Sequence, residues 1–219
     1  MFRFFGQPKF DLVPDHQAPI GYELFLREWR GGQWVLPANF SALTVDSIEP
    51  LLVTTIAAMP ANIELLSFNL EQDQFIDPAF MAMAMRVNAQ TSLRLFLELT
   101  ERLAPGVTED QLVVAAQHYA DHGVLVCVDD VGTGQNSPQM VHRMALSVAE
   151  YKFALQNFRP FATIAELAPK LNLWYRMAQA THKMLAIEGL ETPEELAVIR
   201  RDYPCDVIQG YLLGKPALL

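Results

Sequence analysis

The feature that most restricts the fold is a regular alternation of short apolar runs with segments of helical spacing. Eight runs are rich in leucine, β-branched and aromatic residues: FFGQPKF, IGYELFLR, LLSFNL, LFLELT, VLVCVDD, VAEYKFA, MLAIEGL and VIQGYLLG. Several are apolar on both faces, as expected for parallel strands covered by helices. Strands that alternate with helices form βα units, so the sequence predicts an α/β fold, a (β/α)8 TIM-like barrel.

Two of the helical segments carry clear end signals. Thr108 begins TEDQ, a capping box in which Gln111 reaches back, and Gly123 ends that helix. Thr192 begins TPEEL, with a proline at the first helical position and acidic residues that complement the helix dipole. Weaker helical spacing occupies residues 47–59, 77–88 and 174–183.

The length and composition suit one folded unit. The chain has 219 residues, of which 51% are hydrophobic, enough for a substantial core. It contains no low-complexity tract and no convincing repeat, and a TIM-like barrel alone takes about 250 residues. We therefore expect a single domain over residues 1–219.

The charge and the cysteines restrict the partners and the location. The net charge of −9 and a pI near 5.0 argue against DNA or RNA binding, which needs clustered basic residues. No signal peptide or transmembrane span is recognisable, so membrane insertion is not expected. Cys127 and Cys205 suggest a reduced setting rather than a disulfide framework. The sequence predicts a soluble cytoplasmic protein.

A polar residue occurs late in each of the eight runs, or just after it. In a barrel these residues would form one ring, because the carboxyl ends of the strands meet at one mouth. The ring consists of Gln7, Glu23, Asn69, Glu98, Asp129, Lys152, Glu188 and Gln209.

Gathering so many carboxylates is unfavourable unless protons or cations neutralise them. Hard oxygen donors without cysteine favour Mg²⁺ or Mn²⁺, and the number of oxygens suffices for two ions. The candidate metal ligands are Glu23, Asn69, Glu98, Asp129, Asp130 and Glu188. Taken singly, a polar side chain at a strand end is more often a solvated turn residue, and the Asp129–Asp130 pair is equally typical of a helix-capping loop.

Over nearly its full length the chain resembles the EAL-domain cyclic-di-GMP phosphodiesterases. GYELFLRE is similar to the family's GYEALLR signature, FNLEQDQFIDPAF to its NLS segment, and LELTE is present unchanged. DDVGTGQNS resembles DDFGTGYSS, SVAEYKFA resembles PVDILKID, IEGLET resembles AEGVET, and VIQGYLLGKP resembles VQGYLFGRP. The order of these motifs also agrees.

The resemblance implies a role for each matching residue. It places the same six oxygen ligands at a two-metal site, with Lys152 and Glu188 in catalysis. It places Arg27 on a phosphate, Gln7 and Gln209 on substrate, and Glu101 and Glu191 as loop-stabilising glutamates. Whether Lys152 orients a water molecule, deprotonates it or stabilises developing charge stays open.

The resemblance also implies the barrel type and the activity. Family members have a first strand antiparallel to the others, and they hydrolyse cyclic di-GMP to linear pGpG, often as homodimers. Three positions depart from the pattern: Ala154 replaces the aspartate of K-I-D, Val131 replaces phenylalanine and Gln135 replaces tyrosine. Two alternatives therefore stand beside the active enzyme: a cyclic-di-GMP receptor without turnover, and a scaffold for a regulatory protein partner.

Overall fold

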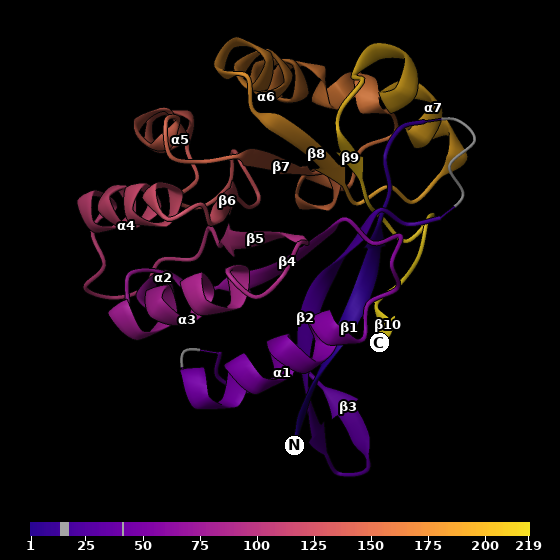
Figure 1. The fold of residues 1–219 in the computed structure, drawn as a ribbon. Helices are drawn as coiled ribbons and strands as arrows, with labels where there is room; N and C mark the ends of the chain where they lie inside the picture. Colours follow the sequence, from indigo (N-terminus) through magenta and orange to yellow (C-terminus); the bar gives the residue numbers. More distant parts are fainter. Residues whose placement is uncertain (14–17, 41) are drawn as a thin grey trace.

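The computed structural model describes residues 1–13, 18–40 and 42–219. It has the expected α/β architecture, a curled and mostly parallel sheet that forms a TIM-like barrel (Figure 1). Each of the eight predicted runs contributes a strand. These are β1 Phe2–Lys9, β2 Gly21–Arg30, β4 Leu65–Leu70, β5 Arg94–Leu99, β6 Leu125–Val128, β7 Glu150–Ala154, β8 Met184–Glu188 and β9 Val207–Ile208.

Strand pairing follows the chain from β2 to β9, and every one of these neighbours is parallel. β1 instead runs antiparallel to β2, which confirms the expected orientation of the first strand. Their register places Gln7 opposite Glu23. An isolated antiparallel bridge between Phe10 and Ile208 joins the β1 side to β9 and closes the barrel.

Two further strands lie outside the predicted runs. β3 (Gln33–Val35) pairs with the far end of β2, and β10 (Ala217–Leu218) pairs with β1. The last predicted run forms a shorter strand than expected. It leaves the sheet after Ile208 and turns at Gly210, whose carbonyl accepts hydrogen bonds from the amides of Leu213 and Gly214.

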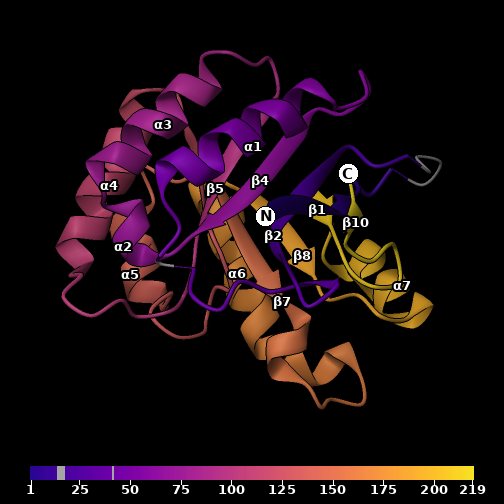
Figure 2. The same cartoon turned by 90° about the horizontal axis from the view of Figure 1, so that it is seen from below.

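Helices surround the sheet, as the view from below shows (Figure 2). They are α1 Val45–Ala57, α2 Gln72–Phe75, α3 Pro78–Asn88, α4 Glu109–Asp121, α5 Pro138–Met144, α6 Ala168–Thr181 and α7 Pro193–Asp202. Each of the seven buries at least one apolar side chain that joins one large core against the outer face of the sheet, among them Leu52, Phe75 and Trp174. None of the described helices is long and apolar enough to cross a membrane.

The end signals place α4 and α7 correctly. Thr108 and Gln111 form the predicted capping box, with a 2.8 Å bond from the Thr108 amide to Gln111 Oε1. α6 begins at Ala168, six residues before the predicted segment. The reason is a preceding 3-10 turn, in which Glu166 accepts hydrogen bonds from the amides at 162 and 163 and Pro169 starts the helix.

The barrel interior is apolar at one end and polar or charged at the other. Near the amino ends of the strands, Leu65, Phe96 and Cys127 form a small apolar cluster of their own. Nearer the carboxyl ends of the parallel strands the buried side chains are polar or charged, and they include Glu23, Glu98 and Lys152. A polar interior at this end positions a site at the barrel mouth, where TIM-type barrels carry their active sites.

Candidate active site

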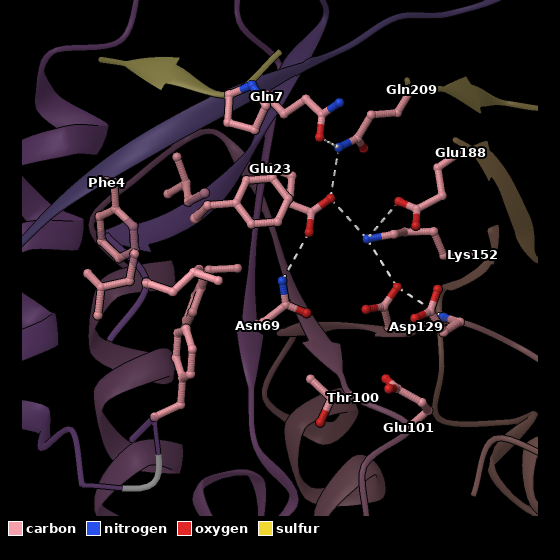
Figure 3. A pocket seen from close by; sticks show the side chains of 18 of the residues that line it. Phe4, Gln7, Glu23, Asn69, Thr100, Glu101, Asp129, Lys152, Glu188 and Gln209 are labelled. Carbon is pink, nitrogen blue, oxygen red and sulfur yellow. Dashed lines mark hydrogen bonds and ion pairs between the residues drawn. The ribbon is translucent and has the colours of Figure 1, made fainter. Parts of the chain in front are cut away.

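The carboxyl ends of the strands converge on a cavity of about 510 Å³. Seven of the eight side chains of the expected polar ring line this cavity, and Figure 3 shows them turned toward a common centre. Glu98 is the exception. Its side chain is fully buried and lies beneath the cavity lining, where it contacts lysines rather than open space.

Lys152 occupies the centre of the ring. Its Nζ lies 3.0 Å from Glu23 Oε2, 2.5 Å from Glu98 Oε2, 3.1 Å from Asp129 Oδ1 and 3.2 Å from Glu188 Oε2. Burial disfavours a charged amine, but the surrounding carboxylates outweigh burial and raise the pKa of Lys152 well above its ordinary value. Lys152 therefore stays protonated among four carboxyl groups.

Glu98 is bound from two sides. Lys9 Nζ lies 2.8 Å from Oε1, and Lys152 takes Oε2. Burial alone would raise the pKa of Glu98, but the two ammonium groups reverse the direction and hold its pKa below the ordinary value. Glu98 therefore stays ionised although no part of its side chain reaches solvent.

Glu23 connects the lysine to a set of amides. Asn69 Nδ2 donates to Glu23 Oε1 over 3.0 Å, and Gln209 Nε2 donates to Glu23 Oε2 over 2.9 Å (Figure 3). Gln209 also donates to Gln7 Oε1 over 3.1 Å, and Gln7 donates to the Gly214 carbonyl. These bonds tie β1, β2, β4 and the segment after β9 into one network.

A second acidic group lies beside the ring. One carboxylate oxygen each from Glu101, Asp129 and Asp130 lies within 4.8 Å of the others. Asp130 has a left-handed backbone with φ 48°, and its amide donates to Asp129 Oδ1 over 3.0 Å. Burial and the neighbouring Asp129 raise the pKa of Asp130 to about 7, and burial raises the pKa of Asp129 as well.

Glu188 lies at the end of β8, between Lys152 and Gln156, whose Nε2 donates to its Oε1 over 2.7 Å. Burial raises the pKa of Glu188 to about 7, against the opposing charge of Lys152. Carboxyl groups with raised pKa values cluster where several anions share one desolvated space. Lys152 therefore compensates only part of the negative charge of the polar ring and of the second acidic group, and further positive charge would stabilise both.

The remaining expected residues lie at the rim. Arg27 and Glu191 line the cavity, and Arg27 is one of its three basic side chains, with Arg102 and Lys152. Glu191 lies 3.4 Å from Arg159, which also binds Glu195 and the Gly189 carbonyl. Ala154 is buried opposite Glu188 in the β7–β8 register, and Val131 is buried after the aspartates.

The donor set fits divalent cations. The described side chains at the site offer carboxylate and amide oxygens, the ligands that Mg²⁺ and Mn²⁺ prefer. Glu101, expected only as a loop residue, lies with the two aspartates and could act as a ligand. The raised pKa values of Asp130 and Glu188 indicate repulsion that a bound cation would relieve.

Two residues that bind the carboxylates of the site, Lys9 and Gln156, are absent from the sequence-based expectations, and so is Glu150, which is buried in the barrel but does not line the cavity. Side chains in a strand alternate between faces, so Lys9 shares the inner face with Gln7, and Glu150 shares it with Lys152. That spacing could have revealed both. Gln156 lies in the 3-10 helix Leu155–Phe158, where no periodic pattern indicates an inward side chain.

The comparisons with known proteins agree with this geometry. A family model described as EAL domain matches residues 2–216. Over 123 residues the chain is 31% identical to cyclic di-GMP phosphodiesterase NbdA of Pseudomonas aeruginosa, covering 56% of this chain and 15% of NbdA. It is 24% identical to the probable cyclic di-GMP phosphodiesterase PdeG of Escherichia coli, over 94% of this chain and 45% of PdeG. The chain thus spans less than half the length of either relative.

A solved structure of the PaMucR phosphodiesterase in a c-di-GMP complex has a TM-score of 0.79 and 26% identity. The superposition covers 99% of this chain and 97% of PaMucR. Its fold is the same curled barrel. Since the family match extends over almost the whole chain and agrees with both the fold and the acidic mouth of the barrel, this chain belongs to the EAL domain family.

Proposed function

We propose that this chain hydrolyses cyclic di-GMP to linear pGpG with the help of two divalent cations, Mg²⁺ or Mn²⁺. The observation that carries the proposal is the floor of the cavity, where Lys152 contacts four carboxylates from four different strands or strand ends. The names of NbdA and PdeG and the c-di-GMP complex of PaMucR support the choice of substrate.

The charge of the cavity explains the need for cations. Its lining includes seven carboxylates, of Glu23, Glu71, Glu101, Asp129, Asp130, Glu188 and Glu191, against three basic side chains. A phosphodiester is anionic, so such a cavity repels it unless cations bind first. The six ligands Glu23, Asn69, Glu98, Asp129, Asp130 and Glu188 would hold those ions, with Glu101 as a further candidate.

Bound divalent cations would supply Lewis-acid polarisation of a phosphate oxygen and lower the pKa of a water molecule. The protein supplies the remaining functions. Lys152 presents its ammonium to the centre of the site, where it stabilises negative charge that develops at phosphorus or orients the attacking water. Arg27 offers a planar donor to phosphate, and Gln7 and Gln209 hold the nucleotide by amide hydrogen bonds.

Glu188 is proposed to take part in catalysis as well as to bind a cation. In the metal-free site its pKa is raised to about 7, and a bound cation would lower that pKa and keep the carboxylate ionised. Gln156 and Lys152 fix its two oxygens, so the carboxylate has a defined direction in the cavity. Glu191 holds the following loop through Arg159.

A second candidate function is a receptor that binds cyclic di-GMP without turnover. Two observations favour it. Ala154 provides no carboxylate at the end of β7, and both oxygens of Glu98 are already bound to lysines. A site with fewer free ligand oxygens can retain nucleotide affinity while its metal occupancy is low.

The test of the proposal is the incubation of the purified protein with cyclic di-GMP and Mg²⁺ or Mn²⁺, followed by chromatography of the nucleotides. We expect conversion to pGpG by the unmodified protein and a loss of at least about 100-fold in Glu23→Gln and Lys152→Met. Glu194→Gln, which changes an exposed carboxylate on α7, is the matched control and should keep full activity.

The result separates the two candidates. Nucleotide binding by calorimetry without any pGpG, at saturating metal, would establish the receptor and reject the enzyme. Equal turnover in Glu23→Gln and in the unmodified protein would reject the site itself.

We also infer that residues 1–219 act as one EAL domain and that the domain works as a homodimer. The family match over residues 2–216 supports the first inference. Light scattering on the eluting protein would test the second, because a monomeric mass throughout the micromolar range would contradict it.

A further inference from the structure

Lys9 is a buried cation that the proposed reaction does not use. It is the last residue of β1, its side chain is 1% exposed, and Glu98 is its one ion-pair partner among the described residues. Lys9 does not line the cavity, so it does not reach a bound nucleotide. An unexplained charge in a barrel interior calls for a reason, because burying an amine is strongly unfavourable.

Lys9 affects the site through its ion-pair partner, Glu98. Glu98 is the one candidate metal ligand with a lysine on each oxygen, Lys9 on Oε1 and Lys152 on Oε2. Glu23, Asp129 and Glu188 share Lys152 alone. Lys152 reaches the cavity and can turn toward substrate, whereas Lys9 is held below it. The charge of Lys9 therefore lies beneath the candidate ligands and apart from the cavity.

We propose that Lys9 is a positioning residue that acts as a fixed counter-charge: it occupies one oxygen of Glu98 and weakens the binding of divalent cations at the barrel mouth. This inference rests on the proposed function, since it concerns the same metal ligands. A fixed positive charge one carboxylate away from a divalent cation repels that cation in a low-dielectric interior. A carboxylate oxygen that accepts a hydrogen bond from an ammonium group is also less available to a metal ion.

The charge of Glu150 has to be controlled when Lys9 is replaced. It is a buried carboxylate on β7, two residues before Lys152, and its Oε1 has no hydrogen-bond partner among the described residues. Lys9 is among the charges that act on it, so removing Lys9 alone leaves Glu150 less well compensated. The double variant Lys9→Met with Glu150→Gln removes both charges and keeps the side-chain volumes.

The test measures Mn²⁺ binding without nucleotide, by electron paramagnetic resonance of free Mn²⁺ and by calorimetry. The proteins are the unmodified chain, Lys9→Met, the double variant and Glu150→Gln as control, each checked for folding by thermal unfolding. We expect the Mn²⁺ dissociation constant to fall at least about tenfold in Lys9→Met and in the double variant, and not in Glu150→Gln. A purely structural role would weaken binding instead.

Unchanged or weaker Mn²⁺ binding in the folded variants would overturn the inference, and the double variant decides if Lys9→Met does not fold. Failure of the proposed function is seen separately. Tighter Mn²⁺ binding in the variants together with no pGpG from the unmodified protein would support the role of Lys9 and reject the enzyme. No Mn²⁺ binding in any of the proteins would reject both.

Discussion

At the scale of single residues, the site is organised by one amine. Lys152 lies within 3.2 Å of oxygens from Glu23, Glu98, Asp129 and Glu188. Without its charge, four carboxylates from four parts of the chain would face each other in a desolvated space. Lys152 therefore stabilises the metal-free fold as well as serving the proposed chemistry, and the two roles can be measured apart.

We expect Lys152→Met to lower the free energy of unfolding of the metal-free protein by about 3 kcal/mol at pH 7, since it leaves buried carboxylates uncompensated. Mg²⁺ should restore much of this loss, because a cation can then take the same oxygens. Urea unfolding with EDTA and with Mg²⁺ measures both quantities. Lys170→Met, an exposed lysine on α6, is the control. A Lys152→Met protein as stable as the control would contradict the role in folding.

How much of the site could be predicted also differs from residue to residue. The twelve expected site residues are at or next to the cavity. Strand-end position predicted the polar ring, whereas rim residues such as Arg27 were expected only from the family resemblance. The ion pairs among them were not predictable. Lys152 contacts Glu23 across 129 positions of sequence, and only the closed barrel brings the two together. Lys9 was missed although its two-residue offset from Gln7 indicated the inner face.

At the scale of elements, the loop between β6 and α5 holds the second acidic group in place. The Gln135 amide donates to the Glu101 carbonyl over 3.0 Å, and the Gly132 amide donates to the Asn136 carbonyl. Gly134 has φ 45°, and a Cβ there would lie 2.5 Å from the Glu101 carbonyl oxygen and 3.0 Å from its Cγ. Only glycine allows this loop to approach Glu101 so closely.

Gly134→Ala should therefore move Glu101 away from Asp129 and Asp130. We expect Mn²⁺ affinity to fall about tenfold, a rough figure for disturbing one support of a metal ligand. Gly123→Ala is the matched control, because Gly123 also has a positive φ, 73°, but a Cβ there meets nothing within 4 Å. Both variants should lose about 1 kcal/mol of stability. Equal Mn²⁺ binding in the two would show that the loop does not position the ligands.

Elements were predictable where side-chain pattern decides them. The eight long apolar runs became strands, and the capping boxes at Thr108 and Thr192 placed two helix starts. β3 and β10 were missed because strands of two or three residues pair through their backbones and show no alternation. The early start of α6 depends on the 3-10 turn before it, which has no sequence period of its own.

At the scale of the whole molecule, the acidic mouth links stability to pH. The folded-state pKa values of Asp130 and Glu188 are about 7, above those of ordinary carboxyl groups. The folded protein therefore binds protons more tightly there than the unfolded chain does, and this contribution to stability is lost as pH rises through 7. Glu98 has a lowered pKa, so its contribution is lost only in strong acid, outside this range.

We expect the metal-free protein to melt about 5 °C lower at pH 8.5 than at pH 5.5, with the decrease occurring below about pH 7 and levelling off above it. Mg²⁺ should flatten the curve, because it compensates the ionised carboxylates. Calorimetric melting over this pH range, with EDTA or Mg²⁺, measures the effect. The double variant Asp130→Asn and Glu188→Gln should remove most of the slope in EDTA, and a slope that persisted would assign it to other groups.

The contact between β1 and β9 that closes the barrel is where local opening is most easily expected. Between β1 and β9, the described residues supply two backbone hydrogen bonds, both between Phe10 and Ile208, whereas β1 and β2 pair over eight positions. Local opening is easiest where few backbone bonds must break. Gln7 and Gln209 lie on opposite sides of this seam and bond to each other across it. A brief separation of the seam would therefore part the two amides proposed to hold the nucleotide, while the other strands stay paired.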